Sequence, residues 1–203
     1  MSSTEIPVPR RRLSREDRLR QLLDRAWRLV REEGTEALTL GRLAEMAGVT
    51  KPVVYDHFST RAGLLAALYK DFDERQNTVL EQALAASEPS LEGRAGVIAS
   101  SYVECVLLQG REIPGVIAAL NGAPELEALK REYEMIFMVK CRDVLAPFAP
   151  SGDISLAGLR AMLGAAEALS HAAASDEISP AQAQEELLET IKAMVRRGAR
   201  LKS

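Results

Sequence analysis

Apolar residues recur every three or four positions along most of this chain of 203 residues. From Leu19 to Val30 this spacing places them on one face of a single helix. Ala and Leu together number 57, whereas Val, Ile and Thr together number 28. No segment alternates apolar and polar residues for long enough to predict a strand. The pattern therefore predicts an all-helical (all-α) protein.

Residues that start or stop helices divide this pattern into segments. Ser and Thr accept hydrogen bonds from the first free N–H groups of a helix, and Gly readily ends one. The last segment also has Pro180 at its first position and Gln182 in the place of a capping box. The predicted helices run from Ser14 to Gly34, from Thr39 to Gly48, from Thr50 onward, from Thr60 toward Ala85, and near residues 91–108, 114–121, 124–145, 155–174 and 179–198.

The same spacing identifies the core side chains of the first four helices. Short helices depend on burying such a face against a neighbour. The side chains expected in the core are Leu19, Leu22, Leu23, Ala26, Trp27, Val30, Leu40, Leu43, Ala44, Ala47, Val54, Phe58, Leu64, Leu65, Leu68 and Phe72.

The composition excludes a largely disordered chain, because 47% of the residues are apolar and 27% are charged. The charge is unevenly distributed. Residues 1–61 hold 12 Lys and Arg against 9 Asp and Glu, whereas residues 62–203 hold 14 against 20. A basic first third predicts a polyanionic partner for that part of the chain.

Nothing in the sequence predicts a membrane span, a secretory signal or a cofactor site. The longest uncharged stretch, residues 113–124, is too short to cross a bilayer. Cys105 and Cys141 are far apart in the sequence and form no metal-ligand cluster, so we expect buried thiols in a reducing environment. We therefore expect a cytoplasmic protein without a cofactor or a metal.

The two short helices predicted within residues 39–58 are the parts of a helix-turn-helix DNA reader. With Val54 and Phe58 turned inward, the outer half of the second short helix would face a major groove. The alternative is a generic helical hairpin in which Tyr55 and His57 only pack locally.

The segment from Leu22 to Leu68 resembles the DNA-binding domain of the tetracycline-repressor (TetR) family of regulators. The resemblance is carried by T-L-G-R-L-A-E-M-A-G-V-T-K-P-V-V-Y-D-H-F, residues 39–58, followed by S-T-R-A-G-L-L. It covers roughly the first 70 residues, and the rest agrees only in length and helical character. The residues that match the family pattern are Pro52, Tyr55, His57, Phe58 and Arg61.

The resemblance implies a role for each exposed residue of this segment. Helix N-termini and cations suit phosphates, whereas side chains from the first turns of the inserted helix suit base edges. Lys51 could donate to a guanine, and Val53 could pack on a thymine methyl group. The implied contacts are Thr39 and Tyr55 with phosphates, Thr50, Lys51, Pro52 and Val53 with base edges, and His57 and Arg61 in support of the backbone contact.

Two positions depart from the family pattern. Asp56 places a carboxylate beside the expected phosphate path, where it would repel unless Lys51 or Arg61 lies close. Gly63 stands where many relatives have a capping Glu, so we expect a loose hinge. Replacing Gly63 with Glu is therefore expected to raise thermal stability.

These assignments divide the chain into four parts. Residues 1–13 form a basic arm, residues 14–60 the DNA-binding domain, residues 61–86 a connecting helix and residues 87–203 a larger helical domain. The arm would either lie along a minor groove or remain a solvated tail.

The larger domain carries none of the common catalytic motifs, so we do not expect an enzyme. The resemblance implies instead a domain that binds a small-molecule effector and forms a dimer. Glu167 and His171, four residues apart, are either a polar pair in the effector pocket or a structural contact. The candidate pocket residues, all of which could equally be plain core, are Tyr102, Val106, Gln109, Ile113, Ile117, Tyr133, Phe137, Met138, Cys141, Glu167 and His171.

The resemblance also implies a homodimer formed through the last two long helices. Small residues would allow close approach of a second copy in residues 155–174, and an apolar stripe would add to the interface in residues 179–198. The alternative is that both surfaces face the core of one chain. The small residues are Ala157, Gly158, Ala161, Gly164, Ala165, Ala168 and Ala172, and the stripe is Leu187, Leu188, Ile191, Met194 and Val195.

The sequence thus predicts a homodimeric transcriptional regulator, expected to act as a repressor that a small molecule releases from a palindromic DNA operator. Two alternatives remain at this point. One is a helix-turn-helix DNA-binding protein without an effector, and the other is an all-helical enzyme or adaptor.

Overall fold

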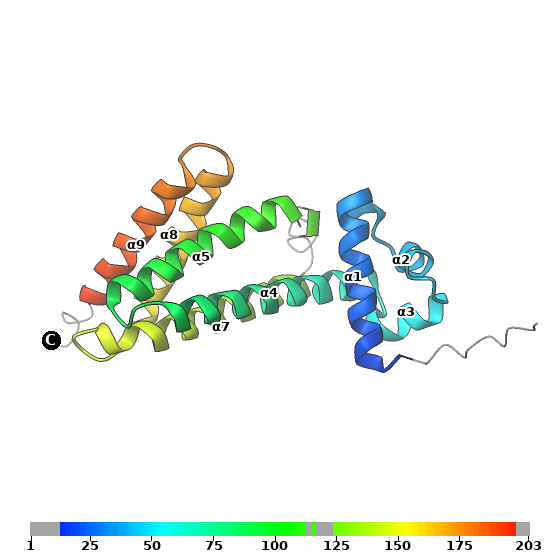
Figure 1. Cartoon of the computed structure of the whole chain (residues 1–203), viewed down its shortest axis with the longest axis horizontal. Helices are drawn as coiled ribbons and strands as arrows, with labels where there is room; N and C mark the ends of the chain where they lie inside the picture. Colours follow the sequence, from blue (N-terminus) through cyan, green and yellow to red (C-terminus); the bar gives the residue numbers. More distant parts are fainter. Residues whose placement is uncertain (1–12, 113–114, 117–123, 198–203) are drawn as a thin grey trace, which may run out of the picture. The chain divides into compact units, whose positions relative to one another are not determined.

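The computed structural model describes residues 13–112, 115–116 and 124–197, and every regular element in these ranges is a helix (Figure 1). The all-α prediction is confirmed. The chain forms two compact units, residues 1–64 and 65–203. The predicted arm, apart from Leu13, and the helix predicted at 114–121, apart from residues 115–116, lie outside the described residues.

The first unit contains α1 (Arg15–Glu33), the 3₁₀ turn η1 (Thr35–Ala37), α2 (Leu40–Ala47) and α3 (Lys51–Phe58). The predicted starts and stops of α1 and α2 are confirmed. The Oγ of Ser14 accepts a hydrogen bond from the Asp17 N–H at 3.0 Å, and Thr39 accepts one from the Arg42 N–H at 3.1 Å. The helices end at Gly34 and Gly48, whose φ angles of 82° and 64° favour glycine.

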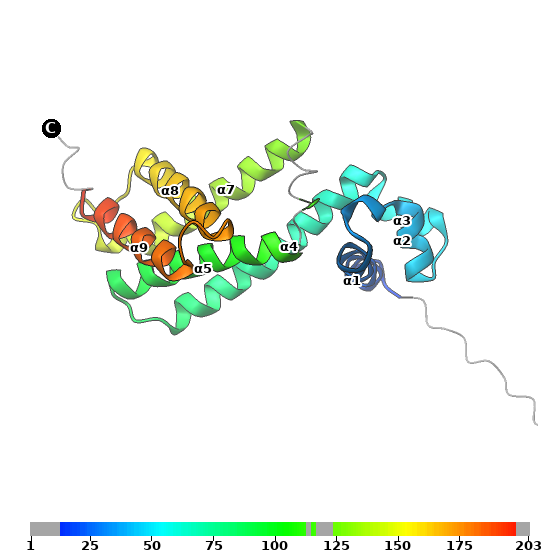
Figure 2. The same cartoon turned by 90° about the horizontal axis from the view of Figure 1, so that it is seen from above.

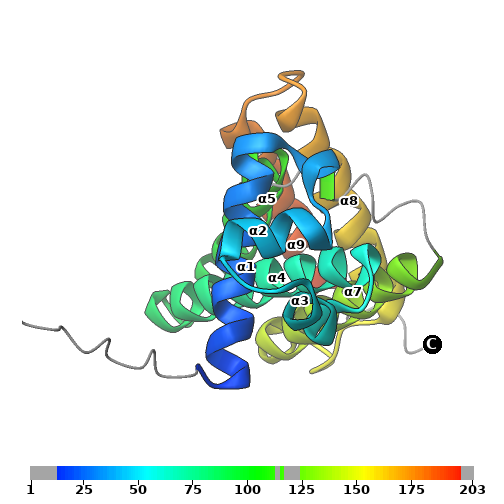
Figure 3. The same cartoon turned by 90° about the vertical axis from the view of Figure 1, so that its right-hand side faces the viewer.

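One shared core holds these helices together. α2 packs against both α1 and α3, and all three are seen from the front in Figure 3. The predicted core is largely confirmed, although Leu19, Leu23 and Ala47 are only half-buried. The fully buried side chains of the unit are those of Leu22, Ala26, Leu29, Leu38, Leu43, Val54 and Leu64.

The long helix α4 (Arg61–Ala86) starts in the first unit and continues into the second. The second unit also contains α5 (Leu91–Glu112), α7 (Pro124–Leu145), η2 (Ala146–Phe148), α8 (Leu156–Ala174) and α9 (Pro180–Arg197). Helices α5, α8 and α9 pack against one another around a common core (Figure 2). Among the described residues, no helix is both long and apolar enough to cross a membrane.

The predicted capping box of α9 is present. The Ser179 N–H donates to Oε1 of Gln182 at 2.9 Å, and the Gln182 N–H donates to Oγ of Ser179 at 3.2 Å. By contrast, η1 and η2 were not expected from the sequence. They are three residues long, which is too short for a helical repeat to be visible.

The turn between α3 and α4 contradicts the expectation for Gly63. A Cβ atom built at this position would lie 2.2 Å from the backbone oxygen of Phe58, which a rigid backbone does not allow. The Gly63 N–H already donates to Oγ1 of Thr60 at 3.0 Å. Glycine is therefore required for close approach of the two helices, and the expected gain from Gly63→Glu is wrong.

We predict that Gly63→Ala lowers the free energy of unfolding by roughly 1–3 kcal/mol, because the methyl group overpacks this turn. Gly96→Ala is the matched control, since a Cβ at position 96 of α5 has no neighbour within 4 Å. The control should be neutral or stabilising by up to about 1 kcal/mol. Urea unfolding followed by circular dichroism measures both changes, and equal stabilities for the two variants would contradict the steric argument.

Candidate nucleic-acid interface and ligand cavity

Helix α3 has one face in the core and one face in water. Val54 and Phe58, four residues apart, are buried and fix the rotation of the helix. Lys51 and Pro52 lie on the exposed side, and 51% of the Tyr55 surface is accessible. An aromatic side chain held in water on a short helix is available to a partner.

The start of α3 lies close to the start of α2. Lys51 extends across Gly41, so that a methyl group at position 41 would lie 3.7 Å from Cε and 3.9 Å from Nζ of Lys51. Thr39 caps the N-terminus of α2, two residues before Gly41. A positive charge and a helix N-terminus next to each other form a site suited to a phosphate.

Thr50 is the N-cap residue of α3, as predicted, but its side chain makes no capping hydrogen bond. The hydroxyl group is exposed and is not used by the helix itself. Val53 is half-buried, so only part of its side chain faces outward.

His57 is half-buried at the end of α3, next to the ring of Phe58 at a centroid distance of 6.1 Å. Burial lowers the pKa of His57, and the charges of Arg15 and Arg18 lower it further. The imidazole is therefore neutral at pH 7 and would contribute a hydrogen bond rather than a charge. The start of α1 thus adds two cations near α3, and Arg18 was not identified from the sequence.

Two N–H groups of Arg61 are used in hydrogen bonds within the first unit. Its Nε donates to the Leu38 carbonyl at 3.0 Å, and its Nη2 donates to the Thr35 carbonyl at 2.9 Å. These bonds tie the start of α4 to η1. Only the remaining N–H groups of this guanidinium are available to a partner.

Asp56 is exposed and forms no ion pair with Lys51 or Arg61 within the described part of the chain. Neither cation therefore neutralises the carboxylate expected to repel a phosphate. Arg42, another nearby cation, is paired with Glu33, to which its Nε donates at 3.1 Å. That hydrogen bond lowers the pKa of Glu33 and joins α1 to α2.

The second unit contains a cavity of about 650 Å³ between α4, α5, α7 and α8. Met138 and Cys141, two of the predicted pocket residues, do not line it and are buried in the core. The side chain of Gln109 and all of Ile113 and Ile117 lie outside the described residues. The predicted pocket residues that line the cavity are Tyr102, Val106, Tyr133, Phe137, Glu167 and His171.

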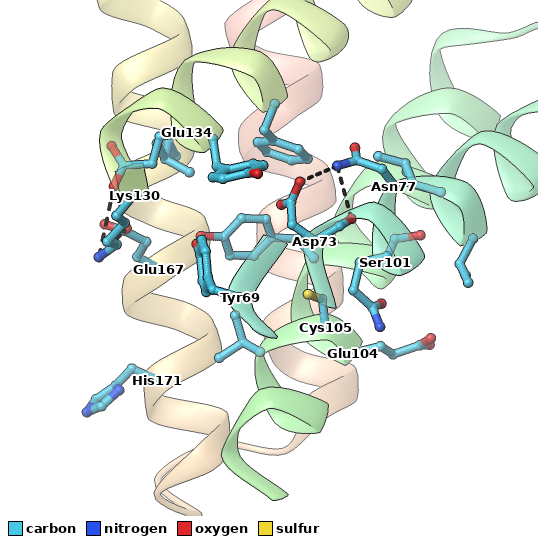
Figure 4. Close-up of a pocket in the computed structure, with 18 of the residues that line it drawn as sticks. Tyr69, Asp73, Asn77, Ser101, Glu104, Cys105, Lys130, Glu134, Glu167 and His171 are labelled. Atoms are coloured by element: carbon cyan, nitrogen blue, oxygen red, sulfur yellow. Dashed lines mark hydrogen bonds and ion pairs between the residues drawn. The ribbon is translucent and has the colours of Figure 1, made fainter. Parts of the chain in front are cut away.

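The contribution of α4 to the cavity was not predicted from the sequence, in which this helix was expected only to connect the two domains. Figure 4 shows Tyr69, Asp73 and Asn77 on one side of the cavity. They are four residues apart and so share one helix face. A row of polar residues within a mostly apolar pattern was the available signal.

Four aromatic rings line the cavity in two contacting pairs. Tyr69 and Tyr133 meet edge to face with their centroids 5.5 Å apart, and Tyr102 and Phe137 are tilted at 5.4 Å. Burial raises the pKa of Tyr69 and of Tyr102, so both phenols are neutral near pH 7.

Asp73 is the carboxylate of the cavity wall that is most affected by burial. Burial raises its pKa to about 6, against the opposing effect of a hydrogen bond that Asn77 donates to its Oδ2 at 2.7 Å. Lys140 also favours the charged form, but its ammonium group donates to Oδ1 of Asn77 at 2.9 Å and to Oε1 of Glu81 at 2.6 Å. Asp73 therefore has a charged neighbour at a distance, not an ion-pair partner.

Two other carboxylates of the cavity wall, those of Glu134 and Glu167, lie close to two cations. Lys130 lies 3.9 Å from both Glu134 and Glu167, and Arg160 lies 3.1 Å from Glu134. No hydrogen bond or ion pair joins Glu167 to His171 in the described part of the chain, and His171 points away from Asp73 in Figure 4. The predicted polar pair is therefore not formed.

The two cysteines differ in their surroundings. Cys141 is buried, and burial raises the pKa of its thiol to about 12. Cys105 is half-buried and lines the cavity, so it is not the core thiol that was expected. Over the described ranges, no cluster of His, Cys, Asp and Glu is arranged to hold a metal ion.

The two surfaces predicted for a dimer have different exposures. On α9, Leu187, Ile191, Met194 and Val195 are buried in their own chain, so the alternative of a core-facing stripe is correct for these four residues. On α8, by contrast, small residues remain exposed along one face of the helix. They are Ala157, Ala161, Gly164 and Ala168, the last two of which also line the cavity.

Comparisons with known proteins agree with the geometry of the first unit. The family model for bacterial regulatory proteins of the tetR family matches residues 22–68. A 73-residue stretch is 36% identical to the HTH-type transcriptional activator FasR from Mycolicibacterium smegmatis. The match includes 36% of this chain and 33% of FasR, so it spans about a third of that protein's length.

Solved structures resemble the chain over most of its length. A TetR transcription regulator from Haloarcula marismortui has a TM-score of 0.70 at 15% identity, over 89% of this chain and 100% of that one. The fatty acid degradation regulator FadR from Bacillus halodurans has a TM-score of 0.66 at 12% identity, over 87% and 99%. At these identities the likeness shows the fold. The matched segment, with its helix-turn-helix geometry, therefore resembles the DNA-binding part of the tetR family of bacterial regulatory proteins over residues 22–68.

Proposed function

We propose that the protein is a homodimeric repressor that reads a near-palindromic DNA operator and releases it when a small molecule occupies the cavity. The observation that carries the proposal is the exposed face of α3 beside the N-terminus of α2, with Lys51 between them. This arrangement offers a phosphate site next to a base-reading surface on a rigid pair of helices.

The phosphate contacts would come from Thr39, Tyr55 and the ammonium group of Lys51, with His57 and the free N–H groups of Arg61 in support. Base edges would meet Thr50, Pro52 and the outer part of Val53, together with Lys51 if its side chain swings away from Gly41. Thr50 is well suited to this role because its hydroxyl group does not cap its own helix.

A dimer would form through α8, where small exposed residues allow the backbone of a second copy to approach closely. The apolar stripe of α9 would support this surface from within the chain. A two-fold axis relates two identical reading helices, so the operator would be a near-palindrome.

The cavity supports an effector. Its volume of about 650 Å³ lies in the range of small-molecule sites, and it combines aromatic walls with a few polar groups. This observation favours the proposal over a helix-turn-helix protein without an effector. The ligand would favour a form whose two reading helices no longer match the half-site separation. FasR is named an activator, whereas we propose repression for this chain.

The first experiment is selection of genomic DNA fragments by the purified protein, with the Lys51→Ala, Tyr55→Ala double variant as the control. We expect the wild-type protein alone to enrich a short near-palindrome. If nothing is enriched at moderate salt, or if the double variant enriches the same fragments, α3 does not read sequence.

On the selected operator, Lys51→Ala should weaken binding and reduce the slope of log affinity against log salt concentration by about 1, because one phosphate contact is lost. Lys70→Ala is the matched control, since Lys70 is an exposed lysine of the second unit whose Nζ lies 3.7 Å from Glu74. Fluorescence anisotropy at several salt concentrations gives both slopes. Equal slopes for the two variants would remove Lys51 from the interface.

The dimer surface can be tested by placing a charge on α8. Ala161→Arg should convert the dimer into a monomer, because an exposed small residue at the proposed contact becomes long and cationic. Ala174→Arg makes the same change at an exposed position on another side of α8 and should leave the dimer intact. Sedimentation equilibrium distinguishes the two, and a dimeric Ala161→Arg variant would place the interface elsewhere.

The raised pKa of Asp73 predicts that the difference in the free energy of unfolding between Asp73→Asn and the wild type varies with pH. The folded protein holds this proton up to a pH of about 6, whereas the ordinary carboxyl loses it near 3.8. Stability contributed by the protonated form is therefore present below pH 3.8 and is lost as the pH rises toward 6. Asp73→Asn keeps an oxygen acceptor for Asn77 and cannot ionise.

The stability of Asp73→Asn relative to the wild type should therefore increase from pH 4 to pH 7. Urea unfolding at four pH values measures it, with Asp143→Asn as the same change at an exposed site of α7. A difference that does not vary with pH would show that Asp73 titrates normally.

A further inference from the structure

The charges that line the cavity are mostly negative. Four carboxylates belong to its wall, from Asp73, Glu104, Glu134 and Glu167, whereas the basic side chains of the wall are Lys130 and His171. Lys130 is shared between Glu134 and Glu167, so its charge is already compensated. An anionic ligand would meet a wall with an excess of its own sign of charge.

Asp73 is a half-buried acid of this wall and has no ion-pair partner among the described residues, whereas Glu104 is exposed to water. No cation of the described residues lies within ion-pair distance of its carboxylate, because Lys140 is occupied by Asn77 and Glu81. A carboxylate partly removed from water and left unpaired is unfavourable unless a charge of opposite sign arrives. Asp73 belongs to the cavity wall, as does Tyr69 four residues earlier on α4 (Figure 4). A cation bound in the cavity would supply that charge.

The aromatic rings suit the same kind of ligand. The faces of Tyr and Phe rings attract cations through their quadrupole, and the attraction increases when water is excluded. Three of the four tyrosines of the chain, Tyr69, Tyr102 and Tyr133, line the cavity together with Phe137. Burial raises the pKa of Tyr69 and of Tyr133, and the negative charge of Asp73 raises both further. The carboxylate of Asp73 therefore acts on both phenol groups.

We propose that the cavity binds a monovalent organic cation, an amine or quaternary ammonium or phosphonium group on an apolar body, with the charge near Asp73 and the apolar body among the aromatic rings. The proposal rests on the proposed function of the cavity as an effector site. It goes further by assigning the chemical class of the effector. A ligand of drug size fits the volume.

A pair of probes with nearly the same shape and opposite charge tests this assignment. Tetraphenylphosphonium and tetraphenylborate are each titrated into the full-length wild-type protein by isothermal calorimetry. We expect the phosphonium to bind at least tenfold more tightly than the borate. Equal affinities, tighter binding of the borate, or no binding of the phosphonium would overturn the proposal.

The position of the charge is tested with a matched pair of variants. Asp73→Asn should reduce the affinity for tetraphenylphosphonium about tenfold or more and leave the affinity for tetraphenylborate unchanged or higher. Asp143→Asn removes the same charge from an exposed site that does not line the cavity, so it should leave both affinities unchanged. The same loss in both variants would mean that the probes respond to net charge and not to Asp73.

A second measurement separates this proposal from the proposed function. The phosphonium is added to the protein bound to its selected operator, and release of DNA is followed by anisotropy. Tight binding of the phosphonium without release supports the ligand class and contradicts effector-controlled release. Failure of the protein to bind any operator contradicts the regulator proposal, whereas the titrations of the free protein still decide the ligand class.

Discussion

The burial of Val54 and Phe58 is the interaction on which the DNA-reading surface depends. Helix α3 is eight residues long, and a helix of that length is not stable alone in water. Its formation and its rotation about its own axis both come from seating these two side chains in the core of the first unit. Because the rotation is fixed, the outward position of Lys51 and Tyr55 is fixed as well.

The rest of the first unit keeps Val54 and Phe58 buried. α2 packs against α1 on one side and α3 on the other, and the turn at Gly48 lets α3 leave at the required angle. The contact between Gly63 and the Phe58 carbonyl then constrains the chain on the other side of α3. Arg61 adds two hydrogen bonds from the same turn to η1. The short helix is thus held at both ends as well as along its inner face.

The first unit was more predictable from the sequence than the cavity, for a physical reason. Caps such as Ser14 and Thr39 act on N–H groups three residues away, so they can be identified along the chain. A cavity is formed by side chains that are distant in sequence, and its wall depends on how helices pack. The unexpected role of Gly63 has the same origin, because the requirement for glycine comes from a carbonyl group five residues earlier across a turn.

Helix α7 shows most clearly why the cavity residues were only partly identified. Phe137 lines the cavity and Met138 is buried in the core, although they are neighbours and both are apolar. One position corresponds to about 100° of rotation, which is enough to move a side chain from one surface to the other. Tyr133 and Phe137 share the cavity face, and Met138, Cys141 and Leu145 share the core face. Apolar character alone does not distinguish the two faces.

Ionisable side chains distinguish a cavity-lining face from a core face better than apolar side chains do. A core face excludes unpaired ionisable groups, because the cost of removing a charge from water is not recovered without a partner. A ligand-binding face tolerates such a group, since the ligand supplies the partner when it binds. Asp73 on α4 is a group of this kind, partly buried and without an ion-pair partner among the described residues. Such a residue lowers the stability of the empty protein and raises its affinity for a ligand of opposite charge, so the same carboxylate couples folding stability to the chemistry of the effector.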